Sequence, residues 1–263
     1  NQGMSLADFK AIFWFEFTHR LLGRLIGVAF FVPMVVFWVK GWVNRTLAPK
    51  LILLFILGGL QGGLGWYMVK SGLIDRPDVS QYRLAAHLGL ALVILSAMLW
   101  VAMNLIKPAP SAAPDRRLKR WVWGLLTLIA VTALSGAFVA GLDAGHTYNT
   151  FPLMDGALVP EGLFRLSPFY LNFFENILTV QFDHRILAIT TFCAIMVFWW
   201  RAGGASLTPA QGLGTRVLAL VAVIQVGLGI STLVLVVPVP LAALHQTGAL
   251  VLLCVAVWLA HEF

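Results

Sequence analysis

The sequence has few charged residues and almost no cysteine. Only 11% of its 263 residues are Asp, Glu, Lys or Arg, whereas soluble domains carry about 25%. Sixty per cent are hydrophobic, so most of the chain cannot face water and we expect an integral membrane protein. The two cysteines, Cys193 and Cys254, both fall inside hydrophobic runs, which argues against a structural disulfide or a zinc site.

Seven hydrophobic runs are long enough to cross a bilayer. About 20 residues of helix span the hydrocarbon core, and a bilayer offers no partner to free backbone groups, so each run is predicted to be a helix. The fold class is therefore all-α integral membrane. The predicted spans are residues 14–39, 51–69, 84–106, 121–141, 181–200, 216–237 and 241–260.

The net charge of +7 reflects membrane topology and does not indicate a nucleic-acid partner. Basic residues gather in the connections at 40–50, 107–120 and 201–216, where Asp115 is the only acid. Acidic residues gather in the alternate connections. By the positive-inside rule, the basic connections face the cytoplasm or matrix and the acidic ones face outward. The outer segment at 142–180 is long for a connection, which is typical of a functional loop.

An internal repeat predicts the architecture. Each half contains a His-Arg pair, then a Gln-x-Gly-Leu-Gly motif, then a further histidine, and both copies cross the membrane in the same direction. The halves are therefore expected to be parallel repeats about an axis along the membrane normal. The matching segments are EFTHRLL at 16–22 with QFDHRIL at 181–187, LQGGLG at 60–65 with IQVGLG at 224–229, and His87 with His245.

The repeat predicts two pseudo-symmetric four-helix bundles. The span at 121–141 leads the second bundle and has no counterpart ahead of the first, so we expect an eighth span upstream of residue 1. The predicted domains are an N-terminal half bundle at 1–110 that lacks its first helix, a cytoplasmic or matrix linker at 111–120, and a C-terminal half bundle at 121–263.

Four of the six histidines occupy equivalent positions of the repeat: His19, His87, His184 and His245. Each falls early in a span that starts at the outer surface, so all four share one depth. A polar side chain inside a membrane is costly and indicates function by default. Two imidazoles that face each other can ligate one haem iron, which predicts one haem between His19 and His87 and one between His184 and His245. A zinc site and a proton relay are weaker alternatives.

Several polar residues accompany these histidines. Arg20, Arg24 and Arg185 are placed to pair with haem propionates. Gln61 and Gln225 lie near the middle of their spans, and either hydrogen-bond across helices or contact haem.

Glu16 breaks the symmetry of the repeat, because its counterpart is Gln181. It precedes His19 by three residues and so shares its helix face. A carboxylate beside a reacting substrate can act as an acid, a base or a stabiliser of a developing cation. A glutamate in the first turn of a helix is also favoured by the helix dipole. The residues alone leave both interpretations open.

The histidines alone also leave the function open. An enzyme that acts on one of its haems and a di-haem electron-transfer cytochrome would use the same four ligands. The cytochrome predicts two identical haem b groups and gives Glu16 no role. A haem transporter or chaperone predicts reversible haem binding without redox chemistry on the haem.

Five long segments carry a family resemblance: EFTHRLLGRLIG, GGLQGGLGWYMVKSGL, GAFVAGLDAGHTYNTFPLMDG, FENILTVQFDHRILAIT and LAALHQTGALVLL. They resemble the haem A synthases, bacterial and mitochondrial enzymes that act in cytochrome c oxidase assembly. The resemblance covers essentially the whole chain. It is closer to the cysteine-free branch found in mitochondria and proteobacteria.

The resemblance implies that the C8 methyl group of haem O is oxidised to a formyl group through a hydroxymethyl intermediate. It implies that His19 and His87 flank the substrate haem O, that His184 and His245 ligate a haem b cofactor, and that Glu16 is the catalytic carboxylate. The implied location is the bacterial plasma membrane or the mitochondrial inner membrane, with the haems near the outer side. Haem O synthase, an electron donor protein and further copies of the chain are compatible partners.

Overall fold

The computed structural model describes residues 5–75, 79–106 and 115–263. Within these ranges the secondary structure is helical, apart from one isolated β-bridge between Met154 and Ala157. The chain divides into two compact units, Asn1–Val79 and Ser80–Phe263, and each is described by itself.

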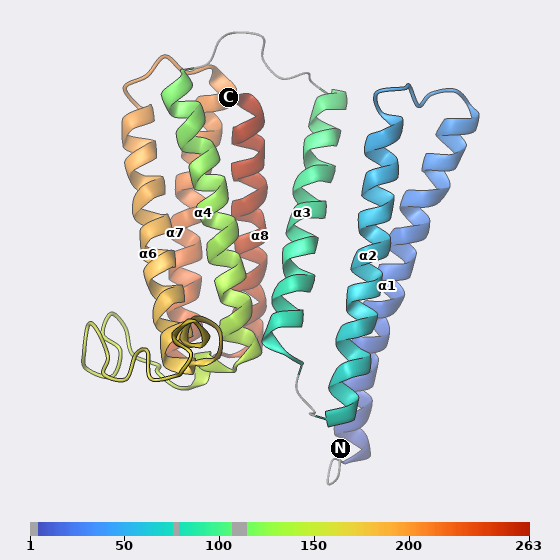
Figure 1. Ribbon diagram of the computed structural model, residues 1–263. Helices are drawn as coiled ribbons and strands as arrows, with labels where there is room; N and C mark the ends of the chain where they lie inside the picture. Colours follow the sequence, from blue (N-terminus) through green and yellow to red (C-terminus); the bar gives the residue numbers. More distant parts are fainter. Residues whose placement is uncertain (1–4, 76–78, 107–114) are drawn as a thin grey trace. The chain divides into compact units, whose positions relative to one another are not determined.

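The seven predicted spans are confirmed as helices long and apolar enough to cross a membrane, which confirms the all-α membrane fold. They are coloured along the chain in Figure 1. The helices are α1 Leu6–Val39, α2 Ala48–Asp75, α3 Gln81–Ile106, α4 Arg116–Gly141, α6 Ile177–Ala202, α7 Pro209–Val234 and α8 Val239–Glu262.

The first unit is the helix pair α1 and α2. A short connection joins them, so they run antiparallel, and they contact each other. Aromatic contacts stabilise the pair, with the Phe55 ring 5.2 Å from Phe31 and 6.5 Å from Phe30 between centroids. Most other large apolar side chains of α1 are exposed in this unit, as expected for a surface that faces lipid or neighbouring helices.

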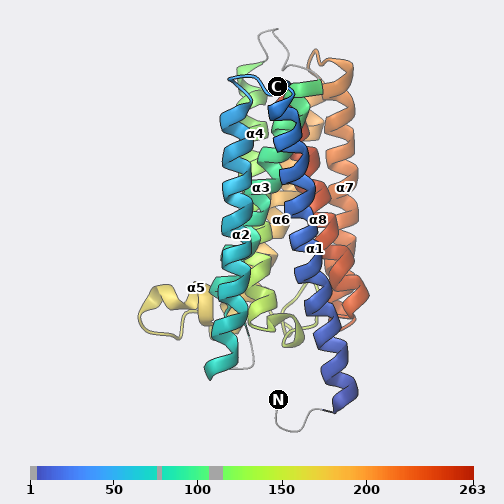
Figure 2. The same ribbon diagram turned by 90° about the vertical axis from the view of Figure 1, so that its right-hand side faces the viewer.

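The second unit is a four-helix bundle with one additional helix. Contacts join α4 to α6, α6 to α7, α7 to α8 and α8 to α4. Helices α6 and α8 therefore lie at opposite corners of the bundle. The additional helix α3 packs on α4 and α8. The bundle helices run side by side in Figure 1 and in the turned view of Figure 2. Its apolar core includes Leu125, Ile129, Phe198, Leu218 and Val257.

Helix α4 begins five residues before the predicted span. The carboxylate of Asp115 accepts hydrogen bonds from the backbone N–H groups of Arg117 and Leu118, at 2.7 and 3.4 Å, and so caps the helix. The basic residues of the first turn lower the local hydropathy, so the hydropathy pattern does not reveal this start. The predicted linker at 111–120 therefore ends within α4, and its residues 111–114 lie outside the described part of the chain.

Polar caps also extend α6 and α7 beyond the predicted spans. The Asn176 side chain accepts from the N–H groups of Leu178 and Thr179 at the start of α6. Thr208 and Gln211 form a capping box at the start of α7, in which each side chain bonds the other's backbone N–H. The predicted division of the chain at residue 110 and the predicted eighth span stay predictions.

The outer loop at 142–176 is folded against the end of the bundle. It contains the short helices η1 Ala144–His146, η2 Phe169–Leu171 and α5 Asn172–Glu175. Asn172 is fully buried. Its amide exchanges two hydrogen bonds with the backbone of Leu166, both 2.9 Å, and donates to the Phe169 carbonyl at 2.8 Å. One side chain thus closes the last third of the loop.

Replacing Asn172 by alanine is expected to loosen this loop without unfolding the helices. The change removes both hydrogen bonds to the Leu166 backbone, whereas the Phe169 carbonyl still accepts from the backbone N–H of residue 172. Each lost hydrogen bond costs about 1 kcal/mol, so we expect local destabilisation of about 2 kcal/mol. Cleavage of the purified protein by a protease, read as the rate of cutting within the loop, measures this. Leu158→Ala, at a loop side chain that is 76% exposed, is the control. Equal cutting of both variants would contradict the role of Asn172.

Candidate functional site

His184 and His245 lie at one depth on opposite corners of the bundle. They are the eighth residue of α6 and the seventh of α8, and both helices start at the end of the bundle that carries the outer loop (Figure 1). The two helices lie across the bundle diagonal. The structure therefore places both histidines of this predicted pair at the same end of one bundle.

The ring of His184 is held from α4. Its Nδ1 lies 2.8 Å from the Ser135 hydroxyl, which in turn donates to the Thr132 carbonyl at 2.7 Å. A metal-binding histidine commonly uses one ring nitrogen for the metal and the other for such an outer hydrogen bond. The arrangement leaves Nε2 of His184 for a ligand.

A glycine lies beside each of the two histidine rings. A Cβ atom added at Gly136 of α4 would come within 3.2 Å of His184 Cε1, and one added at Gly229 of α7 within 2.8 Å of His245 Cε1. Each glycine belongs to the helix that precedes its histidine, five residues before that helix ends. The same packing thus occurs twice within the bundle, and larger residues would push the rings away.

Gln225 contacts His245 from α7. Its Nε2 donates to the His245 carbonyl at 2.9 Å and lies 3.2 Å from the ring Nδ1. The amide oxygen lies where a Cβ atom on Gly248 would overlap it, so a larger residue there would displace this amide. Of the two interpretations of Gln225, the hydrogen bond across helices is the one that this geometry favours.

Arg185 ties the outer loop to α6. Its Nη2 donates to the Tyr148 carbonyl at 2.7 Å, and its Nη1 donates to the Thr150 carbonyl at 2.8 Å and approaches that of Leu153 at 3.4 Å. Gln181 also donates to the Tyr148 carbonyl, at 3.0 Å. Most of the donors of this predicted propionate partner are thus engaged by backbone carbonyls, a role that no motif predicts.

The donor set nevertheless fits a bis-histidine haem. Among the described residues, the Nε atom of Arg185 is buried without a hydrogen-bond partner, and such a donor suits a carboxylate. No group of three His, Cys, Asp or Glu side chains converges within the described ranges, but haem iron needs only two protein ligands. The residues present therefore suit a haem held between His184 and His245.

The other predicted site residues of the first unit lie on α1 and α2. Glu16 and Arg20 form an ion pair at 3.0 Å, so this arginine, predicted to meet a propionate, contacts the carboxylate instead. His19 and Arg24 are exposed in this unit, and Gln61 is half-buried on α2.

Glu16 does not stand in the first turn of its helix. Helix α1 begins at Leu6, ten residues earlier, and the influence of a helix dipole fades within about one turn. The interpretation of Glu16 as a residue placed by the dipole is therefore wrong for this helix. The apolar span itself begins at Ile12, which makes His19 its eighth residue, matching His184 in α6.

His87 lies in the second unit. It is half-buried and is the seventh residue of α3, at the same distance from its helix start as His245. The pairing of His87 with His19 joins residues of the two units and stays a prediction.

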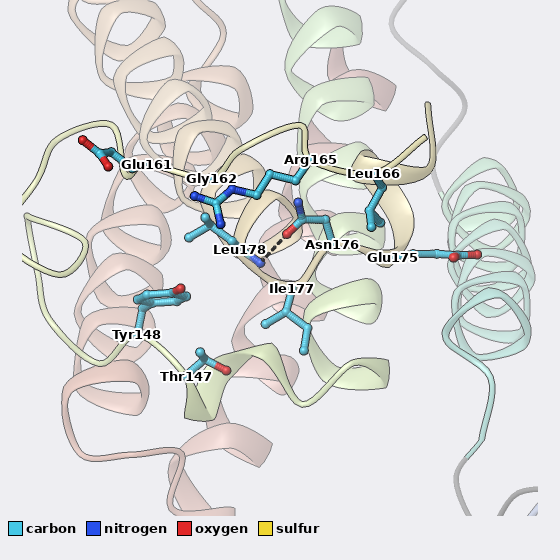
Figure 3. Close-up of a pocket in the computed structure, with 10 residues that line it drawn as sticks. All are labelled: Thr147, Tyr148, Glu161, Gly162, Arg165, Leu166, Glu175, Asn176, Ile177 and Leu178. Carbon is cyan, nitrogen blue, oxygen red and sulfur yellow. Dashed lines mark hydrogen bonds between the residues drawn. The ribbon is translucent and has the colours of Figure 1, made fainter. Parts of the chain in front are cut away.

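A hollow of about 450 Å³ opens in the outer loop beside the start of α6 (Figure 3). Arg165 reaches into it, whereas Glu161 points away. Glu175 also points away and accepts a hydrogen bond of 2.8 Å from the Tyr82 hydroxyl. None of the four repeat histidines lines this hollow, so it is separate from the paired imidazoles.

Comparisons with known proteins show the family of the chain. Residues 1–257 match the COX15-CtaA family model, described as cytochrome oxidase assembly protein. The chain is 52% identical over 265 residues to the heme A synthase of Nitrosospira multiformis, covering 100% of this chain and 74% of that protein. It is 48% identical over 272 residues to heme A synthase COX15 of Homo sapiens, covering 100% of this chain and 66% of that protein. The chain belongs to the COX15-CtaA family of cytochrome oxidase assembly proteins.

Proposed function

We propose that this protein is a haem A synthase, which oxidises the C8 methyl group of haem O to a formyl group through a hydroxymethyl intermediate. Relatives that carry this name are about half identical to it over its whole length. The observation that carries the proposal is the pair of histidines, His184 and His245, which lie at the same end of one bundle on helices across its diagonal, with a side-chain contact at Nδ1 of each ring.

His184 and His245 would hold haem b, the proposed resident cofactor of the second bundle. When bound, it supplies one-electron redox chemistry. The chain's own residues do the rest of the work at this site. Ser135 and Gln225 orient the two rings, and the buried Nε of Arg185 is a donor for one propionate.

Haem O is the substrate of the first half, flanked by His19 and His87. The support is the repeat, which gives these histidines the positions that His184 and His245 hold in the second half. Glu16 is the residue that differs, and it acts on the substrate as a catalytic carboxylate. Arg20 holds that carboxylate at 3.0 Å.

The haems lie near the outer side of the membrane. In the second unit the histidines occupy the end of the bundle next to the outer loop. The opposite end carries Arg116, Arg120, Arg201 and Arg216, at the starts of α4 and α7 and the end of α6. Basic residues mark the cytoplasmic or matrix face, so the histidine end is the outer one. Haem O synthase and an electron-carrying protein are the proposed partners.

Extraction of the haems from the purified protein, with identification by mass, tests the function. We expect haem b together with haem O, its hydroxymethyl form or haem A. Two haem b groups per chain, in cells that make haem O, would favour an electron-transfer cytochrome instead. Haem O that binds reversibly and is never altered would favour a transporter.

A further inference from the structure

Ser135 is a polar side chain in an apolar stretch of α4 that the proposed reaction does not use directly. It is half-buried and faces α6, where its hydroxyl meets the Nδ1 atom of His184 at 2.8 Å. The direction of this hydrogen bond decides which nitrogen of the imidazole is free to bind a metal.

A second partner of the hydroxyl bears on that direction. A serine hydroxyl has one proton, and Ser135 Oγ lies 2.7 Å from the Thr132 carbonyl, which can only accept. With the proton on that carbonyl, Ser135 accepts from His184, which puts the ring proton on Nδ1 and the lone pair on Nε2.

A second contact holds α4 and α6 in the register that this requires. The Thr132 hydroxyl donates to the Leu128 carbonyl at 2.8 Å and lies 2.7 Å from the Thr191 hydroxyl of α6. Thr191 is buried and stands two helical turns beyond His184. Two side-chain contacts, from residues three apart on α4 and seven apart on α6, thus align Ser135 with His184, and Gly136 gives the ring its space.

We infer that Ser135 is the positioning residue of His184: it holds the imidazole with Nε2 toward the haem and strengthens it as an axial ligand. A hydrogen bond from Nδ1–H to an acceptor makes an imidazole more electron-rich, which favours ferric over ferrous iron and lowers the potential of the haem. The inference rests on the proposed function in one respect, that haem b lies between His184 and His245.

His245 is held differently. Its Nδ1 lies 3.2 Å from Nε2 of Gln225, and that nitrogen also donates to the His245 carbonyl at 2.9 Å. His245 thus meets an amide nitrogen where His184 meets a hydroxyl, so the two rings are not held in the same way.

The test uses three substitutions in the purified full-length protein. Ser135→Ala and Ser135→Val remove the acceptor, while Ser135→Thr keeps it with the bulk of valine. Ser231→Ala, an exposed serine near the end of α7, is the control. For alanine and valine we expect a higher haem b midpoint potential, an altered electron paramagnetic resonance spectrum of the ferric haem, and haem b transferred to excess apomyoglobin about 10–100-fold more readily.

The threonine variant and the control should match the wild type in all three measurements. If valine and threonine behave alike, the hydroxyl is irrelevant and the inference is wrong, even if alanine proves unstable. If the wild type itself lacks the spectrum of a bis-histidine haem b, the proposed function fails instead. The two failures are thus distinguishable.

Discussion

Replacing His184 by alanine is expected to leave the protein folded but nearly free of haem b. The second bundle would keep one axial ligand, His245, and lose the ring that Ser135 holds ready. Even the loss of an outer hydrogen bond to a metal ligand costs about 10–100-fold in affinity, so the loss of the ligand itself should lower the haem b content at least about tenfold. The pyridine haemochrome spectrum of purified protein measures that content.

The hydrogen bonds around His184 make this substitution a clean one. When alanine replaces the ring, the Ser135 hydroxyl keeps the Thr132 carbonyl as a partner, so the change leaves no buried donor without one. The change leaves space beside Gly136, where the imidazole ring had packed. Free imidazole should fill this space and restore a low-spin haem b spectrum.

The matched control is His146→Ala, at an exposed histidine in the outer loop. This variant should have the haem b content of the wild type. Haem O should still bind to His184→Ala, since its ligands are proposed to be His19 and His87, but it should not be oxidised. A His184→Ala protein with normal haem b and no response to imidazole would remove this histidine from the site.

The membrane helices could be predicted because their signal is local. Each span is a long apolar run. Because a bilayer offers the backbone no hydrogen-bond partners, such a run forms a helix. The errors lie at the starts of helices, where polar and basic residues belong to the helix but not to the apolar run. Asp115 and Asn176 set two of these starts through side-chain caps, which hydropathy does not detect.

The histidine pair could be predicted because the repeat places both residues at one depth. Ser135 could not, because nothing in the sequence of α4 shows which side chain of the preceding helix meets His184. The available signal was a Ser-Gly step in an apolar span, and Gly136 does pack against the ring. Arg185 was predicted to bind a haem propionate because it follows His184 in the sequence. The fold of the outer loop instead places three backbone carbonyls around its guanidinium group, which the sequence does not reveal.

Glu16→Gln is expected to stop the oxidation of haem O while leaving both haem sites filled. The change gives the first half the amide that the second half already has at Gln181. General acid–base or charge stabilisation by a carboxylate is worth about 10²–10⁴-fold in rate, so conversion of haem O should fall by at least about 10²-fold. The measurement is the ratio of haem O, its hydroxymethyl form and haem A in extracts, alongside the haem b content.

The size of the effect separates this role from a structural one. Glu16 lies ten residues into α1, beyond the reach of the helix dipole, and its ion pair with Arg20 is partly exposed. A surface pair of this kind contributes at most about 1 kcal/mol, so a purely structural Glu16 predicts a small loss of stability and an unchanged rate. Glu161→Gln in the outer loop, an exposed glutamate, controls for the removal of one negative charge. Haem A made at the wild-type rate by Glu16→Gln would show that the asymmetry of the repeat has another cause, whereas arrest at haem O with haem b retained would assign the chemistry to this carboxylate.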